Sequence, residues 1–441
     1  MDIHFIPLND KYLFYRPLKR LAFIGNRALV NYLHARTENP VPGLLKDDIE
    51  KFLEQIGYLD SVDPPDIDEQ LTLLPSMAVL LMTNRCNLSC TYCYAASGSH
   101  KPVDMPWPLA KTVIDTAVAN AQSNGESHFD LSFHGGGEPT LNWSVLTTAV
   151  EYARSFPLSC SISLASNGVW SSKVSDFICH NMDMVTLSCD GIKAVHDVQR
   201  PRVSGRGSFD SVFSSIKALD AAGVDYGIRM TVTPATIDRL ADGVRFLCRE
   251  TGISSIQIEA SFTEHRGVYA DPSEEHSKRF IRAFIDAARS ASEQDVWVYY
   301  SGARPWVIAH AFCLAFTRAL IATPEGRLVT CFEATGDGHP YLDGFTIGRV
   351  TPMGIEVDSK AKADFQSRQE NRRIACKRCF CYWHCCGDCA SRAMVSKAPD
   401  SMRCHINREL TKAIIAGWIE RCGGVWLGAV PSLNNLPPIM D

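Results

Sequence analysis

The sequence predicts an α/β protein built on a partial (β/α)6 barrel, with a small α+β unit before it and a cysteine-rich region after it. Three observations lead to this prediction. Strands followed by helices are expected in the first 70 residues, apolar runs alternate with helical patterns from residue 77 to about 262, and cysteines gather after residue 305. Such an alternation favours a parallel sheet covered by helices.

Residues 1–70 are expected to form the N-terminal unit. The segments IHFIPL and KYLFYRPLKRLAFIG supply two or three short strands, and NRALVNYLHAR and LKDDIEKFLEQIGYL supply two helices. The turn-rich stretch SVDPPDIDEQ then separates this unit from the next.

Residues 75–305 are expected to form the barrel. Its strand-like runs are MAVLLMT (77–83), FDLSFHG (129–135), SCSISLASN (159–167), MVTLSCDG (184–191), YGIRMTVT (226–233) and SSIQIEAS (254–261). In the first helical pattern between them Val113, Ala117 and Ala121 recur every four residues and give one apolar face. Six such units indicate an open barrel, whose functional side chains lie at the C-terminal ends of the strands.

Residues 306–410 form the cysteine-rich region, and residues 411–441 form a tail with one helix-like stretch. Of the 17 cysteines, six lie between residues 376 and 389. The start of the chain lacks the pattern of a secretory signal, so we expect a cytoplasmic protein. In a reducing compartment clustered cysteines more often bind metal or carry out chemistry than form disulfides.

Charge and hydropathy exclude two classes of partner. The net charge of −5 and a pI near 6.2 show no basic surface, which disfavours a nucleic-acid partner. No apolar run approaches the roughly 18 residues that cross a bilayer, so no membrane partner is expected.

Cys86, Cys90 and Cys93 follow the first barrel strand in the pattern C-x3-C-x2-C. Thiolates are soft ligands that suit zinc or iron–sulfur clusters. Three thiolates on a four-iron cluster leave one iron open to a substrate or cofactor. The alternative is a closed zinc site that takes its fourth ligand from His100 or His134.

This pattern, with Tyr92 before the third cysteine, resembles the signature of the radical S-adenosylmethionine (SAM) superfamily. Further matches follow in order at predicted strand ends, namely HGGGEPT with its Gly-Gly-Glu-Pro element, ASNG, and LSCDGIKAVHDVQRP. The resemblance implies a contact of the glycine-rich element with the methionine amino group, a ribose site at ASNG, and a carboxylate site in the last segment, where an arginine fork is suitable. The implied cofactor-binding residues are Tyr92, Gly136, Gly137, Glu138, Ser166, Asn167, Ser188 and Arg200.

The resemblance also implies a chemistry. A [4Fe-4S] cluster on Cys86, Cys90 and Cys93, reduced by an external one-electron donor, would split bound SAM into methionine and a 5′-deoxyadenosyl radical. That radical would remove a hydrogen atom from an unreactive C–H bond of the substrate. The cofactors supply the reactivity, and the protein supplies position and exclusion of side reactions.

The downstream cysteines read C-x12-G-x4-C, then C-x2-C-x5-C-x3-C, then a final cysteine. This resembles the seven-cysteine SPASM extension, which holds two auxiliary four-iron clusters. The resemblance implies that one cluster is enclosed by Cys376, Cys379, Cys385 and Cys404, and that the other is held by Cys313, Cys331 and Cys389. Cys381 and Cys386 are candidates for its fourth ligand, and a zinc ribbon is the alternative for the whole region.

Proteins with this extension mostly act on peptides or proteins, so a ribosomally made peptide is the expected substrate and its oxidative crosslinking the expected reaction. The N-terminal unit resembles small winged-helix elements that bind leader peptides by strand addition, and a cap on the barrel is the alternative.

Two other functions are considered. An anaerobic sulfatase maturase would form formylglycine, but Ser301 stands where those proteins carry an aspartate base, and serine is a poor base at neutral pH. Glu259, at the end of the sixth strand, is interpreted as a surface glutamate of no special role, and a catalytic base is the alternative. The remaining class is a non-catalytic iron–sulfur or zinc scaffold.

Overall fold

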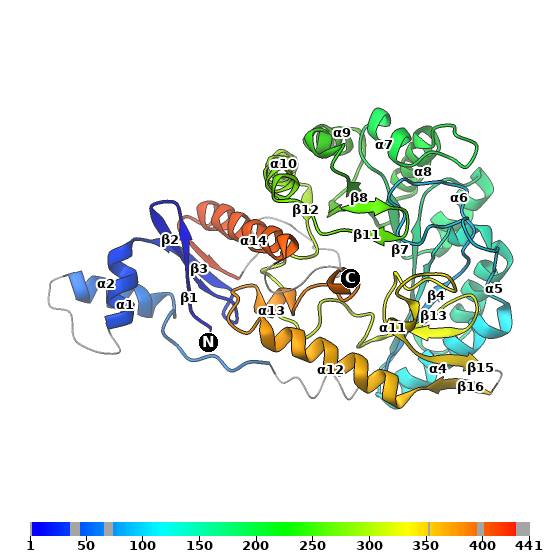
Figure 1. Cartoon of the computed structure of the whole chain (residues 1–441), viewed down its shortest axis with the longest axis horizontal. Coiled ribbons are helices and arrows are strands. Elements are labelled where there is room, and N and C mark those ends of the chain that lie inside the picture. Colours follow the sequence, from blue (N-terminus) through cyan, green and yellow to red (C-terminus); the bar gives the residue numbers. More distant parts are fainter. Residues whose placement is uncertain (1, 36–44, 66–73, 352, 395–400, 429–441) are drawn as a thin grey trace.

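The computed structural model describes residues 2–35, 45–65, 74–351, 353–394 and 401–428, and its core is a curved parallel sheet covered by helices (Figure 1). The six predicted strands are β4 (Met77–Leu81), β5 (His128–His134), β6 (Ser159–Ser166), β7 (Met184–Ser188), β8 (Tyr226–Val232) and β9 (Ser255–Ala260). They pair in parallel in chain order. The predicted α/β class and partial barrel are thereby confirmed.

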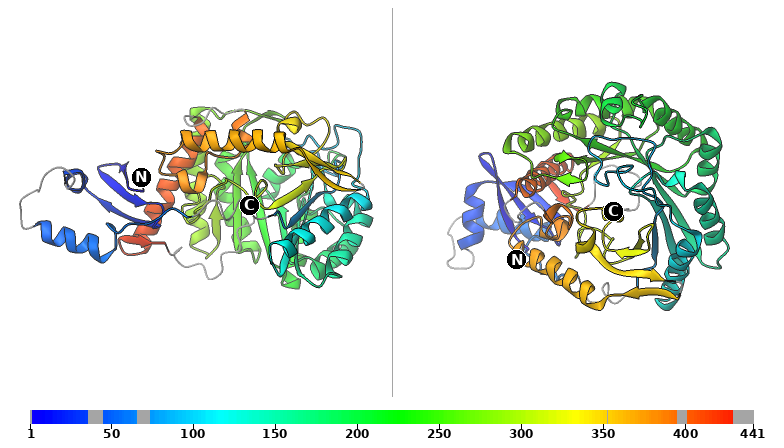
Figure 2. Two further views of the ribbon diagram at one scale, coloured as in Figure 1. Left: turned by 90° about the horizontal axis from the view of Figure 1, so that it is seen from below. Right: turned by 45° about the vertical axis from the view of Figure 1, so that its right-hand side comes forward.

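Helices cover the outer face of this sheet, as Figure 2 shows. They are α4 (Trp107–Ser123), α5 (Trp143–Arg154), α6 (Ser172–Asn181), α7 (Lys193–Gln199), α8 (Phe209–Ala222), α9 (Leu240–Glu250) and α10 (Glu274–Ser292). The strands alternate accordingly. In β5 the side chains of Phe129, Leu131 and Phe133 are buried in the core beneath the helices, so the polar residues between them face the barrel interior.

The sheet continues past both ends of the predicted barrel. The strand β12 (Trp297–Tyr299) adds to β9, and β13 (Ala319–Ala322) pairs in parallel with β4. Antiparallel strands β14 (Arg327–Val329), β15 (Thr346–Thr351) and β16 (Gly354–Val357) then extend the sheet to eleven strands. The cysteine-rich region is therefore joined to the barrel through its sheet, which the sequence did not indicate.

The rest of the cysteine-rich region is mainly helical. It contains α11 (Leu342–Phe345), α12 (Ser359–Ala375), α13 (Tyr382–Cys385) and α14 (Met402–Arg421). A short hairpin of β10 (Thr263–His265) and β11 (Val268–Tyr269) follows β9. Its backbone touches the cysteine loop, because Gly267 N donates to Cys93 O at 2.9 Å.

The N-terminal unit has the predicted strands β1 (His4–Leu8), β2 (Lys11–Arg16) and β3 (Leu21–Gly25) and helices α1 (Arg27–Ala35) and α2 (Leu45–Gln55). A fourth strand, β17 (Val425–Leu427), comes from the end of the chain and pairs with β3. Trp426 of this strand is fully buried and packs against Trp418 of α14. Helix α14 also runs across residues 410 and 411, so the division into four domains stays a prediction.

None of the helices in the described ranges is both long enough and apolar enough to span a membrane.

Candidate active site

The three-cysteine loop follows β4 and is held by the end of α7 and the segment that follows it. Ser89 N donates to Pro201 O at 2.7 Å, and Thr91 N donates to Gln199 O at 2.9 Å. This pairing fixes Cys86, Cys90 and Cys93 beside the ends of the neighbouring strands.

The thiols of this loop are partly buried. Leu88 N donates to Cys86 Sγ at 3.4 Å, and Cys93 Sγ lies 3.5 Å from Ser97 Oγ. Burial raises the pKa of Cys86 to about 12 and that of Cys90 to about 11. Because a metal binds thiolates rather than thiols, a cluster bound here would displace these protons.

The glycine-rich element after β5 packs directly on the cysteine loop. Gly137 N donates to Thr83 O at 2.9 Å, and Glu138 N donates to Arg85 O at 2.8 Å. A Cβ atom at position 137 would lie 1.9 Å from Arg85 O, and one at Gly136 would lie 2.6 Å from Thr335 Cβ. Gly137 is therefore required by the close approach of the Arg85 backbone, and Gly136 by the side chain of Thr335.

Glu138 ties this element to the end of β6. Its Oε1 accepts hydrogen bonds from Thr140 Oγ1 and Ser166 Oγ, both at 2.8 Å, and its Oε2 accepts one from Asn167 N at 2.8 Å. The carboxyl is buried, which raises its pKa. Glu138 and Ser166 are thus hydrogen-bonded to each other in this structure, and the charge of Glu138 lies close enough to Cys86 to raise the pKa of that thiol further.

Asn167 also lies near the first thiol of the cysteine loop. Its Nδ2 donates to Asn87 Oδ1 at 2.7 Å and lies 3.7 Å from Cys86 Sγ. The contact links the end of β6 to the cysteine loop. Asn87 was not predicted from the sequence, although it stands next to the first cysteine.

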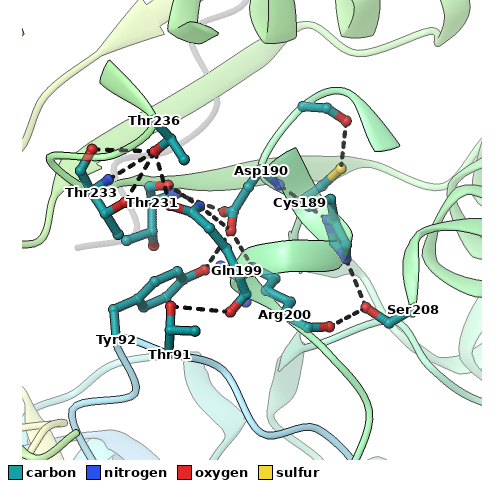
Figure 3. A network of polar contacts seen from close by, with 12 residues as sticks. Thr91, Tyr92, Cys189, Asp190, Gln199, Arg200, Ser208, Thr231, Thr233 and Thr236 are labelled. Carbon is teal, nitrogen blue, oxygen red and sulfur yellow. Dashed lines mark hydrogen bonds and ion pairs between the residues drawn. The ribbon is translucent and has the colours of Figure 1, made fainter. Parts of the chain in front are cut away.

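A buried network joins the cysteine loop to the end of β7 (Figure 3). Its centre is Asp190, which the sequence did not single out. Asp190 Oδ2 accepts hydrogen bonds from Arg200 Nε at 3.0 Å, Tyr92 Oη at 2.7 Å and Gln199 Nε2 at 2.8 Å, and its Oδ1 accepts one from Thr231 N at 3.0 Å. Two predicted cofactor-binding residues, Tyr92 and Arg200, are therefore held by one carboxylate.

Ser188 is the last residue of β7 and pairs with Arg229 of β8. The preceding residue, Leu187, lies in the core under the helices. Because successive side chains of a strand point to opposite faces, Ser188 faces the barrel interior. The structure thus brings the predicted cofactor-binding residues to the C-terminal ends of β4, β5, β6 and β7, at one edge of the sheet.

The second group of cysteines surrounds a cavity in the cysteine-rich region. The cavity is lined by Cys376, Cys379, Cys385 and Cys404 together with Cys381. The first four are the cysteines that the resemblance assigns to one cluster. Cys381 Sγ also lies 3.6 Å from Thr411 Oγ1, on the same side.

The third group contains Cys313, Cys331 and Cys389. Burial raises the pKa of Cys331, and the nearby charges of Glu333, Cys389 and Cys313 raise it further, so these groups are close neighbours. Ser391 Oγ links Cys389 to Glu333, since it lies 3.2 Å from Cys389 Sγ and donates to Glu333 Oε2 at 2.5 Å.

Neither candidate for the fourth ligand is assigned by these contacts. Cys381 lines the cavity of the second group. Cys386 Sγ donates to Ala309 O at 3.2 Å. The fourth ligand of the third group therefore stays open.

A preassembled site for a single metal ion is not present in the described part of the chain. There, no three His, Cys, Asp or Glu side chains are grouped to hold one ion. His134 packs against Phe332 with ring centres 5.2 Å apart, and the ring of His100 lies beside Gly338.

Glu259 is buried, so its interpretation as an exposed glutamate is wrong. Ile258 and Ala260 belong to the core under the helices, and Glu259 therefore faces the barrel interior. Its Oε1 accepts hydrogen bonds from Gln257 Nε2 at 3.0 Å and Ser301 N at 3.1 Å. Its Oε2 has no hydrogen bond to the described residues.

Residues 80–247 match the model of the Radical SAM superfamily. A cysteine-type anaerobic sulfatase-maturating enzyme of Clostridium novyi (strain NT) is 26% identical over 343 residues, which are 71% of this chain and 87% of that protein. The sporulation killing factor maturation protein SkfB of Bacillus subtilis (strain 168) is 29% identical over 213 residues, which are 48% of this chain and 45% of that protein. The matched part thus spans less than half of SkfB.

The fold is also similar to a solved structure, native anSMEcpe with bound AdoMet and Kp18Cys peptide. The TM-score is 0.61 at 18% identity, over 79% of this chain and 99% of that chain. At this identity the likeness concerns the fold alone.

Proposed function

We propose that this chain, a member of the radical SAM superfamily with a C-terminal region of the SPASM type, oxidises a ribosomally made peptide by forming a crosslink. The observation that carries this proposal is the convergence of three cysteines, a glycine-rich element and the Arg200 network at one edge of the sheet. Two further cysteine groups in the C-terminal region would hold auxiliary redox centres that accept electrons from this oxidation.

The donor set fits a cluster and SAM. Cys86, Cys90 and Cys93 would hold the cluster and leave one iron open. When bound, the cluster and SAM supply a 5′-deoxyadenosyl radical that removes a hydrogen atom from the peptide. The backbone at Gly136 and Gly137 would accept from the methionine ammonium, Ser188 and Arg200 would bind the carboxylate, and Asn167 would lie near the ribose. Glu138 and Ser166 would hold these loops in place.

The auxiliary clusters are proposed on the two C-terminal groups. Cys376, Cys379, Cys385 and Cys404 would enclose one cluster in the cavity that they line. Cys313, Cys331 and Cys389 would hold the other, next to the buried Glu333.

Oxidation of the peptide also releases a proton, and Glu259 is the proposed acceptor. One of its oxygens is fixed by two donors, and the other faces the barrel interior without a described partner. A carboxylate held in this way can accept a proton from a substrate placed beside it. Removal of one hydrogen atom, one proton and one electron balances the two-electron oxidation of the peptide.

A leader peptide is proposed to bind the N-terminal unit by strand addition. The edge of β3 is already occupied by β17, and the edges of the four-stranded sheet are β1 and β17. A leader would have to pair with one of these two strands.

The second candidate is an anaerobic sulfatase maturase, supported by the relative that matches over 71% of this chain. Ser301 at the position of the expected aspartate weighs against it. Glu259 could compensate, because Ser301 N donates directly to its carboxylate.

The test is anaerobic reconstitution with iron and sulfide, reduction with dithionite, and measurement of 5′-deoxyadenosine. A Cys86→Ala/Cys90→Ala/Cys93→Ala variant serves as control. If the unaltered chain forms 5′-deoxyadenosine and the variant does not, the result supports the enzymatic function. If neither forms it, the protein is better described as a non-catalytic iron–sulfur scaffold.

Two peptides then separate the candidate reactions by mass spectrometry. A short peptide encoded beside the gene for this chain should lose two hydrogens if a crosslink forms. The Kp18Cys peptide should lose its sulfur if formylglycine forms. Modification of the second peptide only would reject the crosslinking proposal.

A further inference from the structure

We infer that Asp190 is a positioning residue that orients the guanidinium of Arg200 toward the SAM carboxylate and fixes it to the cysteine loop through Tyr92. The inference rests on the proposed function, since it takes Arg200 as a SAM contact. It adds a residue that neither the motifs nor the comparisons assign.

The geometry of Arg200 requires such a partner. Its side chain is 7% exposed and forms an ion pair with Asp190 through Nε. The two terminal nitrogens make no hydrogen bond to the residues that the structure describes. Asp190 thus fixes Nε of the guanidinium. The two terminal nitrogens are left to bind a carboxylate through two parallel hydrogen bonds.

Asp190 can hold this position because it is buried and ionised. Burial by itself would raise the pKa of Asp190, but the charges of Arg200 and His196 and the hydrogen bonds from Arg200 and Tyr92 outweigh burial and lower it. An anion with four donors in a buried place cannot turn without leaving one of them unpaired. The carboxylate is therefore a fixed anchor for the guanidinium.

The same anchor reaches the cysteine loop. Tyr92 donates to the oxygen that also binds Arg200, and the guanidinium lies over the Tyr92 ring with its carbon 5.2 Å from the ring centre. Tyr92 stands between Cys90 and Cys93 in the chain. The SAM carboxylate site and the cluster loop are thereby set relative to each other by a single side chain (Figure 3).

Asparagine at position 190 would break this arrangement. One of its δ atoms becomes an NH2 group, which cannot accept from three donors, and the charge opposite the buried guanidinium disappears. Arg200 would then lose its orientation, and only ligands that use the carboxylate site would be affected.

The experiment compares two ligands that differ in this group. Binding of SAM and of 5′-methylthioadenosine, which lacks the amino acid carboxylate, is measured by calorimetry on the reconstituted, unreduced holoenzyme. For Asp190→Asn we expect at least tenfold weaker binding of SAM and less than twofold weaker binding of 5′-methylthioadenosine.

A double-mutant cycle tests the route of the effect. If Asp190 acts through Arg200, the Asp190→Asn change should have no further effect on SAM binding in an Arg200→Met background. Equal weakening of both ligands, or unchanged SAM binding, would overturn the inference. If iron content and melting temperature show that Asp190→Asn does not fold, Asp190→Glu decides, because it keeps the charge and displaces the carboxylate. A loss of threefold or more for SAM alone then supports the inference, and any other result overturns it.

Failure of the proposed function can be distinguished from failure of this inference. The proposed function fails if the unaltered holoenzyme binds no SAM and makes no 5′-deoxyadenosine. If the unaltered enzyme does both and the Asp190 variants match it, only the role of Asp190 is wrong.

Discussion

Replacement of Gly137 by alanine should dislodge the glycine-rich element from the cysteine loop. The added Cβ would lie 1.9 Å from Arg85 O, a backbone atom that cannot rotate away. The hydrogen bonds Gly137 N to Thr83 O and Glu138 N to Arg85 O would be lost as the loops separate. Each bond contributes about 1 kcal/mol, and overpacking costs about 1–3 kcal/mol, so we expect about 3–5 kcal/mol less stability.

The assay is urea unfolding of Gly137→Ala, followed by fluorescence, together with SAM binding by the reconstituted variant. Gly417→Ala is the matched control, because Gly417 lies on the exposed face of α14 and an added Cβ there meets no atom within 4 Å. This control should gain up to about 1 kcal/mol from helix propensity. A Gly137→Ala variant as stable as the unaltered chain, with normal SAM binding, would refute the close approach of the two loops.

Three other predictions concern the clusters, the N-terminal unit and the base. Three four-iron clusters require about twelve iron atoms, so the Cys86→Ala/Cys90→Ala/Cys93→Ala variant should keep about eight by iron analysis; four or fewer would reject the two auxiliary clusters. Trp426→Ala removes a fully buried side chain with which β17 packs against α14. The free energy of unfolding should fall by about 3–5 kcal/mol, and proteolysis of the N-terminal unit should become faster. Unchanged proteolysis would argue that the N-terminal unit is not held by α14. Glu259→Gln should keep the melting temperature and the formation of 5′-deoxyadenosine, but it should lower the yield of modified peptide per 5′-deoxyadenosine by about a hundredfold or more. Glu259→Asp should restore part of that yield. An unchanged yield in Glu259→Gln would exclude Glu259 as the base.

The barrel was predictable because its signal is local. Each of the six strands is an apolar run followed by a helical pattern, and each chemical motif follows a strand end. Parallel strands must then present those ends at one edge, so the motifs were expected to meet. The group of Cys376, Cys379, Cys385 and Cys404 was likewise expected from its resemblance, and the structure places these four around one cavity.

The features that sequence reasoning missed depend on pairing between distant segments. Strands β13 and β17 are short, and nothing within them indicates that they join β4 and β3. Asp190 lay inside the predicted strand-like run MVTLSCDG (184–191), and only the fold brings Arg200, Tyr92 and Thr231 onto its carboxylate. Glu259 was interpreted as exposed for the same reason, because its burial depends on what faces it across the barrel.

The central claim is that the cluster on Cys86, Cys90 and Cys93 presents an open iron to SAM. Electron–nuclear double resonance of the dithionite-reduced enzyme, with SAM carrying 15N in its amino group and 17O in its carboxylate, measures this directly. We predict hyperfine coupling of both labels to the cluster, and loss of both in the Cys86→Ala/Cys90→Ala/Cys93→Ala variant. A reduced cluster that shows no coupling to either label while SAM is bound would contradict the claim.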